Sequence, residues 1–260
     1  MASEQTYVQR DQPPGVPPLE LTGERTLPDV PDENYWFRRH LVVYEWIGRR
    51  VAGLDVVDMA CGEGYGADVL AARARSVVGV DANPEAHAHA AARYGRDNLR
   101  FARDLVERFA PEEKCDAVCF LQTIEHLEDP ASALDHFRSI LRPGGVAYIS
   151  TPNVLTLAPK GAERSGNPWH VREYRAEEFA GLLYGHFSDV EMHGLFHAGK
   201  LRWHDWMLRA GWDAVHPRVG LSGAFYSRFI PAISVRDFSL RAGVPARLQR
   251  ALDFVAVCRP

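Results

Sequence analysis

The sequence predicts an α/β fold with a parallel β-sheet, and three observations support this. Between residues 54 and 151, short apolar runs of strand length alternate with amphipathic stretches of helical length. Such alternation is typical of βαβ units, whose parallel strands are joined by crossover helices. A glycine-rich turn follows the first apolar run, and a length of 260 residues suits one domain with an insertion. We therefore expect residues 21–260 to form a single domain with an N-terminal cap (21–51) and an insertion (197–250).

The N-terminal part divides into two segments of different character. Residues 1–20 are polar, contain four of the 17 prolines and show no apolar periodicity. We expect this segment to be disordered or loosely packed. Apolar residues then recur at helical spacing, as at Phe37, Leu41 and Tyr44, which predicts a helix near 33–51.

The elements of the sheet domain follow in order. Apolar runs predict strands at 54–60, 76–81, 98–104, 115–122, 146–151, 187–194 and 251–258. Helical patterns lie between them at 66–75, 84–94, 130–145 and 176–185. A long loop, 153–174, follows the fifth strand. Loops of this length in a compact domain usually serve a function, and this one leaves the sheet at the edge where α/β proteins bind ligands.

Composition argues against several classes of protein. The 30 basic and 34 acidic residues give a net charge of −4, which argues against a nucleic-acid-binding surface. The four cysteines are scattered and lack CxxC spacing, so neither a disulfide framework nor a zinc site is expected. The N-terminus lacks the apolar stretch of a signal peptide, and no run of about 18 apolar residues occurs. We expect a cytoplasmic protein without a transmembrane segment.

The most specific motif is VVDMACGEGYGADVL, in which Gly62, Gly64 and Gly66 occupy the turn between a strand and a helix. Glycines allow such a turn to tighten and a ligand to approach the backbone. The N-terminus of the next helix directs free N–H groups into the same site. Asp81 ends the following strand, where an acid commonly binds ribose hydroxyls.

Charge helps to choose among the ligands that such a loop binds. The spacing Gly62-x-Gly64-x-x-Ala67 also fits a looser dinucleotide pattern, so spacing alone leaves open an NAD-type site, a nucleoside site and a ligand-free turn. Asp58 ends the first strand and Glu63 lies inside the loop. Two acids would repel a pyrophosphate and attract a cationic sulfonium with its ammonium group. The charges therefore favour a positively charged nucleoside.

Five blocks in order, DMACGEGYG, VVGVDANP, FARDL, FLQTIEHLEDP and LRPGGVAYIST, resemble the motifs of class I S-adenosylmethionine-dependent methyltransferases. The resemblance covers about residues 54–153. It implies a Rossmann-like α/β sheet of seven strands with the last strand antiparallel, and S-adenosylmethionine as cofactor. The cofactor-binding residues expected from these motifs are Asp58, Ala60, Gly62, Gly64, Tyr65, Gly66, Asp81, Ala82, Asp104, Leu105, Leu121 and Gln122.

The resemblance also assigns roles within this set. Asp58 and the glycine loop would hold the methionine part, Asp81 the ribose, and Asp104 with Leu105 the adenine. The segments TGERTLPDVPDENYWFRRH and NPWHVREY resemble actinobacterial sugar O-methyltransferases of the methylglucose lipopolysaccharide type. This finer resemblance implies a sugar or oligosaccharide substrate, for example a glucose 6-hydroxyl in a methylated polysaccharide.

The predicted N-terminal helix offers a further cofactor contact. Such a helix can lie over the donor, with Arg38, Arg39 or His40 near the donor's carboxylate. The alternative is a helix that packs through its aromatic residues while its arginines face water.

Methyl transfer to a hydroxyl needs in-line geometry and benefits from a general base, most often histidine. His170, in the long loop, is the first candidate base, although NPWHVREY could instead contact substrate or anchor the loop. His126, just after the fourth strand, is the second candidate, with a positioning role as its alternative. Neighbours of His170 are expected to contact the sugar or to order the base, and they are Trp169, Arg172, Glu173 and Tyr174.

Two further features leave alternatives open. Gln122 stands where some quinone-pathway relatives carry the first acid of a Glu-x-x-Glu-His metal motif, and a neutral amide is a poor magnesium ligand. We therefore expect no required metal.

In the insertion, Trp203 and Trp206 share a helix face and could form a substrate lid, a homodimer contact or an additional core. The remaining alternatives for function are a methyltransferase for a small quinone, lipid or phenol, an NAD-dependent dehydrogenase, and a non-catalytic binding module.

Overall fold

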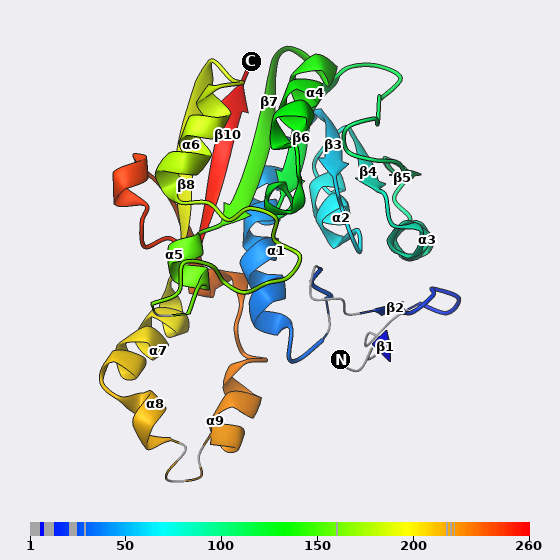
Figure 1. Ribbon diagram of the computed structural model, residues 1–260. Coiled ribbons are helices and arrows are strands. Elements are labelled where there is room, and N and C mark those ends of the chain that lie inside the picture. Colours follow the sequence, from blue (N-terminus) through cyan, green and yellow to red (C-terminus); the bar gives the residue numbers. More distant parts are fainter. Residues whose placement is uncertain are drawn as a thin grey trace.

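The computed structural model describes residues 6–7, 13–20, 25–28, 30–159, 161–216, 218, 220 and 222–260. They form a twisted β-sheet with helices on both faces and a helical arm that projects from one end (Figure 1). The strands of the main sheet are β3 (Asp55–Met59), β4 (Ser76–Asp81), β5 (Leu99–Arg103), β6 (Cys115–Leu121), β7 (Leu141–Pro152), β8 (Asp189–His197), β9 (Phe238–Ala242) and β10 (Asp253–Arg259).

The order of strands in this sheet is β5-β4-β3-β6-β7-β10-β8-β9. Strands β3 to β7 pair in parallel, and β10 pairs antiparallel with both β7 and β8. The α/β class and the antiparallel last strand are thereby confirmed. The sheet has eight strands, one more than expected, because β9 from the insertion pairs antiparallel with the outer edge of β8.

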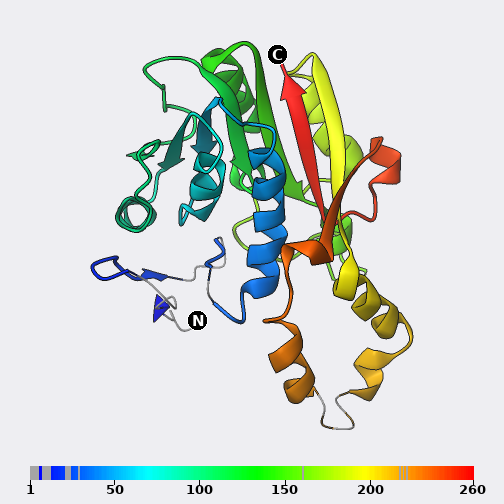
Figure 2. The same ribbon diagram turned by 180° about the vertical axis from the view of Figure 1, so that it is seen from behind.

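Two helix layers enclose the sheet. Helices α1 (Asn34–Gly48) and α2 (Tyr65–Ala71) pack on the face seen in Figure 2, where Ile47 and Leu70 are fully buried. The opposite face is covered by α4 (Pro130–Ile140) and α6 (Ala176–Tyr184). The remaining helical elements are α3 (Pro84–Arg93), α5 (Val154–Leu157), α7 (Gly199–Arg209), α8 (Trp212–Val215), α9 (Ser222–Phe229), and the 3-10 turns η1 (Ile124–His126), η2 (Val235–Asp237) and η3 (Pro245–Arg247).

Local sequence explains where several helices begin and end. Asn83 and Asp129 precede α3 and α4, and their side chains accept hydrogen bonds from first-turn N–H groups. Helix α4 stops five residues before the predicted end at 145, because the chain enters β7 at Leu141, which pairs with Cys115. Helix α2 is likewise shorter than the predicted 66–75.

The described residues of the N-terminal segment pack against the domain. Strand β1 (Thr6–Tyr7) pairs with β2 (Leu19–Glu20), and Leu19 forms a small buried cluster with Leu27, Val30 and Ala86. The expectation of a disordered or loosely packed 1–20 therefore needs correction at Leu19, and residues 1–5 and 8–12 lie outside the described part. All four cysteines are free and buried. In the described part of the chain, no helix has the length and apolar character needed to cross a bilayer.

Candidate active site

The carboxyl ends of β3 and β6 form the floor of a cavity of about 380 Å³. Ala60 and Gln122 follow these neighbouring strands, and both have left-handed backbone conformations, with φ of 56° and 53°. Such conformations cost free energy in residues other than glycine and concentrate at functional sites. Both residues line the cavity, as do Leu121 and Tyr65. Ligand binding at this edge is the general rule for open α/β sheets.

The three glycines of the loop are glycine for different structural reasons. A Cβ added to Gly62 would meet no atom within 4 Å, and Gly62 lines the cavity with a φ of 55°. By contrast, a Cβ on Gly64 would lie 2.8 Å from Ala90, and one on Gly66 would lie 2.1 Å from the ring of Tyr44. Only Gly62 therefore leaves open space that a ligand can fill, whereas Gly64 and Gly66 allow the protein to pack on itself.

Asp81 presents its carboxylate at the cavity wall. Its Oδ2 accepts a hydrogen bond from Gly62 N (2.8 Å), and its Oδ1 accepts one from Asn83 N (2.9 Å). These two bonds fix the carboxylate, and each oxygen keeps a lone pair for a ligand hydroxyl. Ala82 lines the same wall, whereas Asp104 and Leu105, expected beside the adenine, are not among the lining residues.

Asp58 lies behind the cavity wall. It is fully buried, it accepts a hydrogen bond from the Tyr44 hydroxyl (3.2 Å), and its Oδ2 has no hydrogen-bond partner. Burial and, to a smaller extent, nearby Asp81 raise the pKa of Asp58 to about 8, against the opposing effect of the hydrogen bond from Tyr44. The carboxyl is therefore largely protonated at neutral pH. Direct contact of a ligand with a charged Asp58 was expected, and the structure places Tyr44 on the cavity side instead.

The charge of Glu63 is compensated within the protein. Its carboxylate lies 3.2 Å from Arg93 Nε and 3.1 Å from His89 Nε2, and it accepts hydrogen bonds from the Tyr94 hydroxyl (2.7 Å) and Tyr65 N (3.1 Å). Glu63 lines the first cavity, but its charge is already paired within the protein. His89 is fully buried in this network.

A second cavity of about 440 Å³ adjoins the first. The residues that line both cavities are Arg25, Thr26, His40, Gln122 and His126. Burial lowers the pKa of His40 to about 4, so this imidazole is neutral and does not provide a cation for a carboxylate. Two adjoining cavities at one sheet edge offer separate places for a donor and an acceptor.

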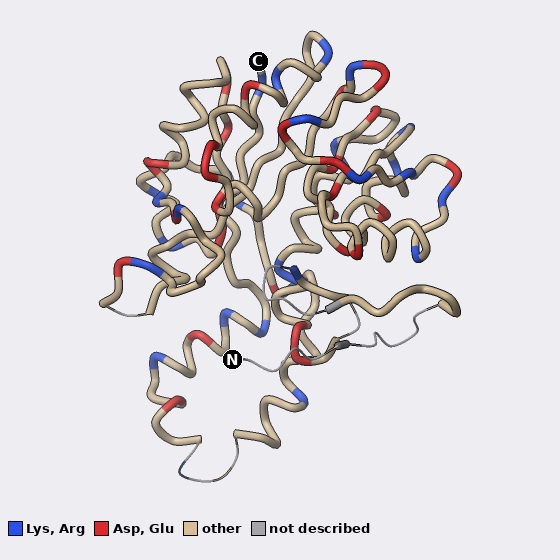
Figure 3. Tube along the Cα trace, turned by 45° about the vertical axis from the view of Figure 1, so that its right-hand side comes forward, with Lys and Arg blue, Asp and Glu red and all other residues tan. Residues whose placement is uncertain are grey.

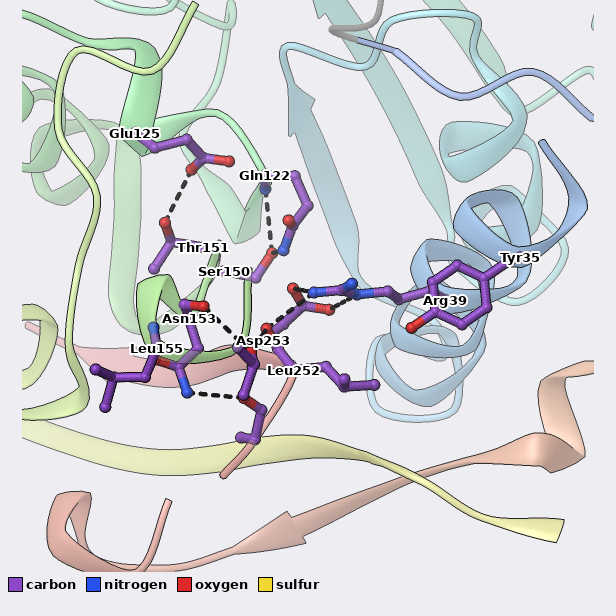
Figure 4. Close-up of polar contacts among 12 residues, drawn as sticks. Tyr35, Arg39, Gln122, Glu125, Ser150, Thr151, Asn153, Leu155, Leu252 and Asp253 are labelled. Carbon is purple, nitrogen blue, oxygen red and sulfur yellow. Dashed lines mark hydrogen bonds and ion pairs between the residues drawn. The ribbon is translucent and has the colours of Figure 1, made fainter. Parts of the chain in front are cut away.

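Hydrogen bonds and an ion pair at the ends of β7 and β10 support the wall between the first and second cavities (Figure 4). Arg39 of α1 forms a buried ion pair with Asp253 of β10, with Nη2 to Oδ1 at 2.6 Å. Gln122 Nε2 donates to Ser150 Oγ at 3.0 Å. The sequence predicts Arg39 as a donor contact or as a solvent-facing side chain, and the structure places it in this ion pair. The lone acid in the apolar run of β10 was the available signal for Asp253.

His170 lies on the wall of the second cavity and is 8% exposed. Its Nδ1 donates to Glu173 Oε1 (2.8 Å), and its Nε2 accepts from Asn167 Nδ2 (3.0 Å). Ser165 N and Oγ both donate to Glu173. Burial raises the pKa of Glu173, but the bonds from Ser165 and His170 outweigh this and hold it below its usual value. The result is an oriented imidazole with an ionised carboxylate behind it.

His126, the second candidate base, lies beside His170. Its Nδ1 donates to the carbonyl of Trp169 (2.9 Å), and its ring lies 5.0 Å from the ring of His170. Arg172 N donates to the carbonyl of Glu125 (3.1 Å), so the long loop is fixed to η1 at two points. One ligand atom each from Glu125, His126 and His170 lies within 4.8 Å of the others, a group able to hold a metal ion. Each of these side chains also has a protein hydrogen-bond partner.

The expected sugar contacts around His170 have different positions. Tyr174 is fully buried against Phe179 in the core, so its expected contact with substrate is wrong. Glu173 orders His170, which is one of the two roles expected for it. Trp169 is half exposed and Arg172 is exposed, and neither side chain lines the two cavities. Asn167, Arg25 and Thr26, which do line the second cavity, were missed because they have no motif of their own.

Comparisons with known proteins identify the family of this sequence. Residues 34–216 match the family described as "Methyltransferase domain". A probable S-adenosylmethionine-dependent methyltransferase of Mycobacterium tuberculosis is 40% identical over 247 residues, which are 92% of this chain and 89% of that protein. A ubiquinone biosynthesis O-methyltransferase of Psychrobacter arcticus is 35% identical over 44% of this chain and 48% of that protein.

A solved structure supports the fold. A SAM-dependent methyltransferase from Thermotoga maritima, described as a possible histamine N-methyltransferase, matches with a TM-score of 0.59 at 15% identity, over 88% of this chain and 94% of that chain. Because the family match and the 40% identity each extend over most of the sequence, this chain belongs to the S-adenosylmethionine-dependent methyltransferases.

Proposed function

We propose that this methyltransferase transfers the methyl group to a hydroxyl of a sugar or glycan. The observation that carries the proposal is the His170–Glu173 pair on the wall of the second cavity, beside the cavity suited to the donor. An alcohol is a weak nucleophile and benefits from an oriented base, whereas an amine or thiol needs less help.

The first cavity fits S-adenosylmethionine. Open space above Gly62 accommodates a ligand against the backbone, and the fixed carboxylate of Asp81 suits a ribose diol. We assign Ala60, Gly62, Asp81, Ala82 and Gln122 to this ligand, with the other expected lining residues Tyr65, Leu121 and His40. When bound, S-adenosylmethionine supplies a methyl group already activated by the sulfonium charge.

In the second cavity, His170 Nε2 is the atom that takes the proton from the acceptor hydroxyl. Glu173 holds the proton on Nδ1 and thereby keeps the lone pair on Nε2. Asn167 Nδ2 lies 3.0 Å from Nε2 and marks the position that an acceptor hydroxyl would take. His126 lines both cavities, so we assign it to positioning at their junction.

The lining of the second cavity suits a polyhydroxylated acceptor. Most of its residues carry hydrogen-bonding side chains, and its apolar residues include Trp36, Pro152 and Leu157. Sugar sites commonly combine such polar groups with an aromatic surface, and Trp36 provides one.

The partial similarity to ubiquinone biosynthesis O-methyltransferases favours a second candidate, a small quinol or phenol as acceptor. We place the reaction in the cytoplasm, where four free thiols remain reduced.

The test is transfer of labelled methyl from S-adenosylmethionine to two acceptor panels, glucose oligosaccharides and α-glucans in one, catechols and quinols in the other. We expect label on a glycan hydroxyl, and label on the phenols alone would overturn the sugar assignment. His170→Ala should lower kcat by about 10²–10⁴-fold. His87→Ala, on α3 and outside both cavities, is the matched control. Nearly full turnover in His170→Ala would exclude His170 as the base.

Glu173→Gln tests the positioning role. An amide can still bond to His170 but does not supply the negative charge that stabilises the imidazolium. We expect kcat to fall at least tenfold, because the imidazolium formed in the reaction loses its neighbouring negative charge. KM for the acceptor should change little. A large rise in KM with an unchanged kcat would instead assign Glu173 to substrate binding.

A further inference from the structure

The helical arm, residues 199–232, stands apart from the sheet but is fixed at its base (Figure 1). Asn34 Nδ2 of α1 donates to the carbonyls of Ile230 (2.8 Å) and Ile233 (3.0 Å). The Tyr35 hydroxyl lies 2.8 Å from His197 Nε2, just before the arm begins. Because Trp36 and Arg39 of the same helix line the second cavity, the arm has a fixed position relative to that cavity.

The arm packs its own apolar interior. The ring of His204 on α7 lies 4.9 Å from Phe229 and 5.6 Å from Tyr226, both on α9, and Trp212 of α8 lies 5.4 Å from Phe225. These contacts hold α7 and α9 together. The outward side of α7 is therefore not needed to keep the arm folded.

That outward side carries two tryptophans and two arginines. Arg202, Trp206 and Arg209 are spaced by four and three residues and share one helix face, with Trp203 beside them. Trp203 is 51% and Trp206 is 64% exposed, so neither forms the additional core that was one expectation for them. Within the described part of the chain, the guanidinium groups of Arg202 and Arg209 have no ion-pair partner. We call these four residues the arginine–tryptophan face.

The charge of the arm differs from that of the whole protein. Residues 199–232 contain five basic and two acidic residues, in a chain whose total is 30 basic and 34 acidic (Figure 3). One of the two acids, Asp205, already bonds to His197 Nδ1 at 2.8 Å. The arm is thus a basic projection on an otherwise acidic protein, and its surface is complementary to an anionic partner.

We propose that the arginine–tryptophan face binds the surface of an anionic lipid bilayer. Tryptophan is favoured at the boundary between headgroups and acyl chains, and basic residues beside it are attracted to anionic lipids. A twofold dimer through the same face would bring the arginines of both copies together, so like charges would oppose that contact. Binding through the arm would hold the second cavity close to the membrane, where a lipid-linked acceptor would be presented.

The test is sedimentation of the full chain with sucrose-loaded vesicles, of phosphatidylcholine alone or with one part in three of phosphatidylglycerol. We expect binding to the second kind only, and a blue shift of tryptophan emission on binding. Arg202→Gln with Arg209→Gln should weaken binding about thirtyfold. Trp203→Ser with Trp206→Ser should abolish the blue shift. Arg100→Gln with Arg108→Gln removes the same charge from exposed positions elsewhere and should leave binding unchanged.

Several outcomes would overturn the proposal. They are absence of binding to the anionic vesicles, equal binding by the arm variants and the wild type, or equal loss in the control pair. A wild-type dimer in solution that becomes a monomer in the tryptophan variant would assign the face to self-association. Transfer of methyl to soluble oligosaccharides should be unchanged in all arm variants, so this test is independent of the acceptor assignment.

Discussion

Replacing Asp58 with asparagine should change how the stability of this protein depends on pH. The side chain is fully buried at the end of β3, with one oxygen bonded to Tyr44 and the other without a partner. Asparagine has the same shape and can still accept the bond from Tyr44. It cannot ionise, so it removes the titration and leaves the packing in place.

The size of the effect follows from the pKa. Burial raises the pKa of Asp58 from 3.8 to about 8. Between these values the native protein retains a proton that the unfolded chain has released, so the free energy of unfolding falls as pH rises. Each pH unit in this window costs about 1.4 kcal/mol, which amounts to about 3 kcal/mol between pH 5 and pH 7. Asp58→Asn should lose none of this.

The measurement is urea unfolding of both proteins at pH 5 and pH 7. We expect the wild type to lose about 3 kcal/mol more than Asp58→Asn over this interval. Burial also raises the pKa of Glu125 to about 8, but Glu125 is present in both proteins and cancels in the difference. Asp189→Asn, at an exposed position of β8, should behave as the wild type. Equal losses in the wild type and Asp58→Asn would show that Asp58 is ionised in the folded protein.

Four other tests concern the site and its support. Gly62→Ala should weaken binding of S-adenosylmethionine by calorimetry with a stability loss near 1 kcal/mol, whereas Gly66→Ala, which clashes with Tyr44, should cost about 1–3 kcal/mol or more in urea unfolding. Arg39→Met leaves Asp253 buried and unpaired, and should lower the free energy of unfolding by about 3–5 kcal/mol; a loss below 1 kcal/mol would contradict the ion pair's role. Methyl transfer should survive EDTA, and activity lost to EDTA but restored by magnesium would refute the metal-free expectation.

The elements of the sheet domain could be predicted because their signals are local. The run at 76–81 is strand β4 with the same bounds, since consecutive apolar residues buried on both faces leave little ambiguity. Strand β9 was missed, because a short run in the insertion resembles the surrounding helical stretches until the edge of β8 is available to pair with it. Its existence depends on a partner more than 40 residues away in the sequence.

The candidate site was predicted where a motif carried the signal and not elsewhere. Gly62 and Asp81 line the first cavity because the β3–α2–β4 unit fixes its own geometry, and Gln122 lines it because β6 ends beside β3. The Arg39–Asp253 pair joins residues 214 positions apart, and no local pattern encodes such a contact. Whether Tyr174 faced substrate or core depended on how the long loop returned to the sheet, which single-sequence periodicity does not determine.

The ligand of the first cavity was inferred from two acids, and the structure changes that reasoning. Glu63 is paired with Arg93 and His89, and the raised pKa of Asp58 leaves it largely neutral. Of the acids that line the first cavity, Glu63 and Asp253 form ion pairs with arginines, whereas Asp81 has no ion-pair partner among the described residues and is positioned for hydroxyls. Preference for S-adenosylmethionine over a dinucleotide therefore depends less on attraction to the sulfonium than on the open space at Gly62 and the hydrogen bonds of Asp81. S-adenosylhomocysteine, whose sulfur carries no charge, should then bind with an affinity within about tenfold of that of S-adenosylmethionine. An affinity a thousandfold lower would restore the electrostatic explanation.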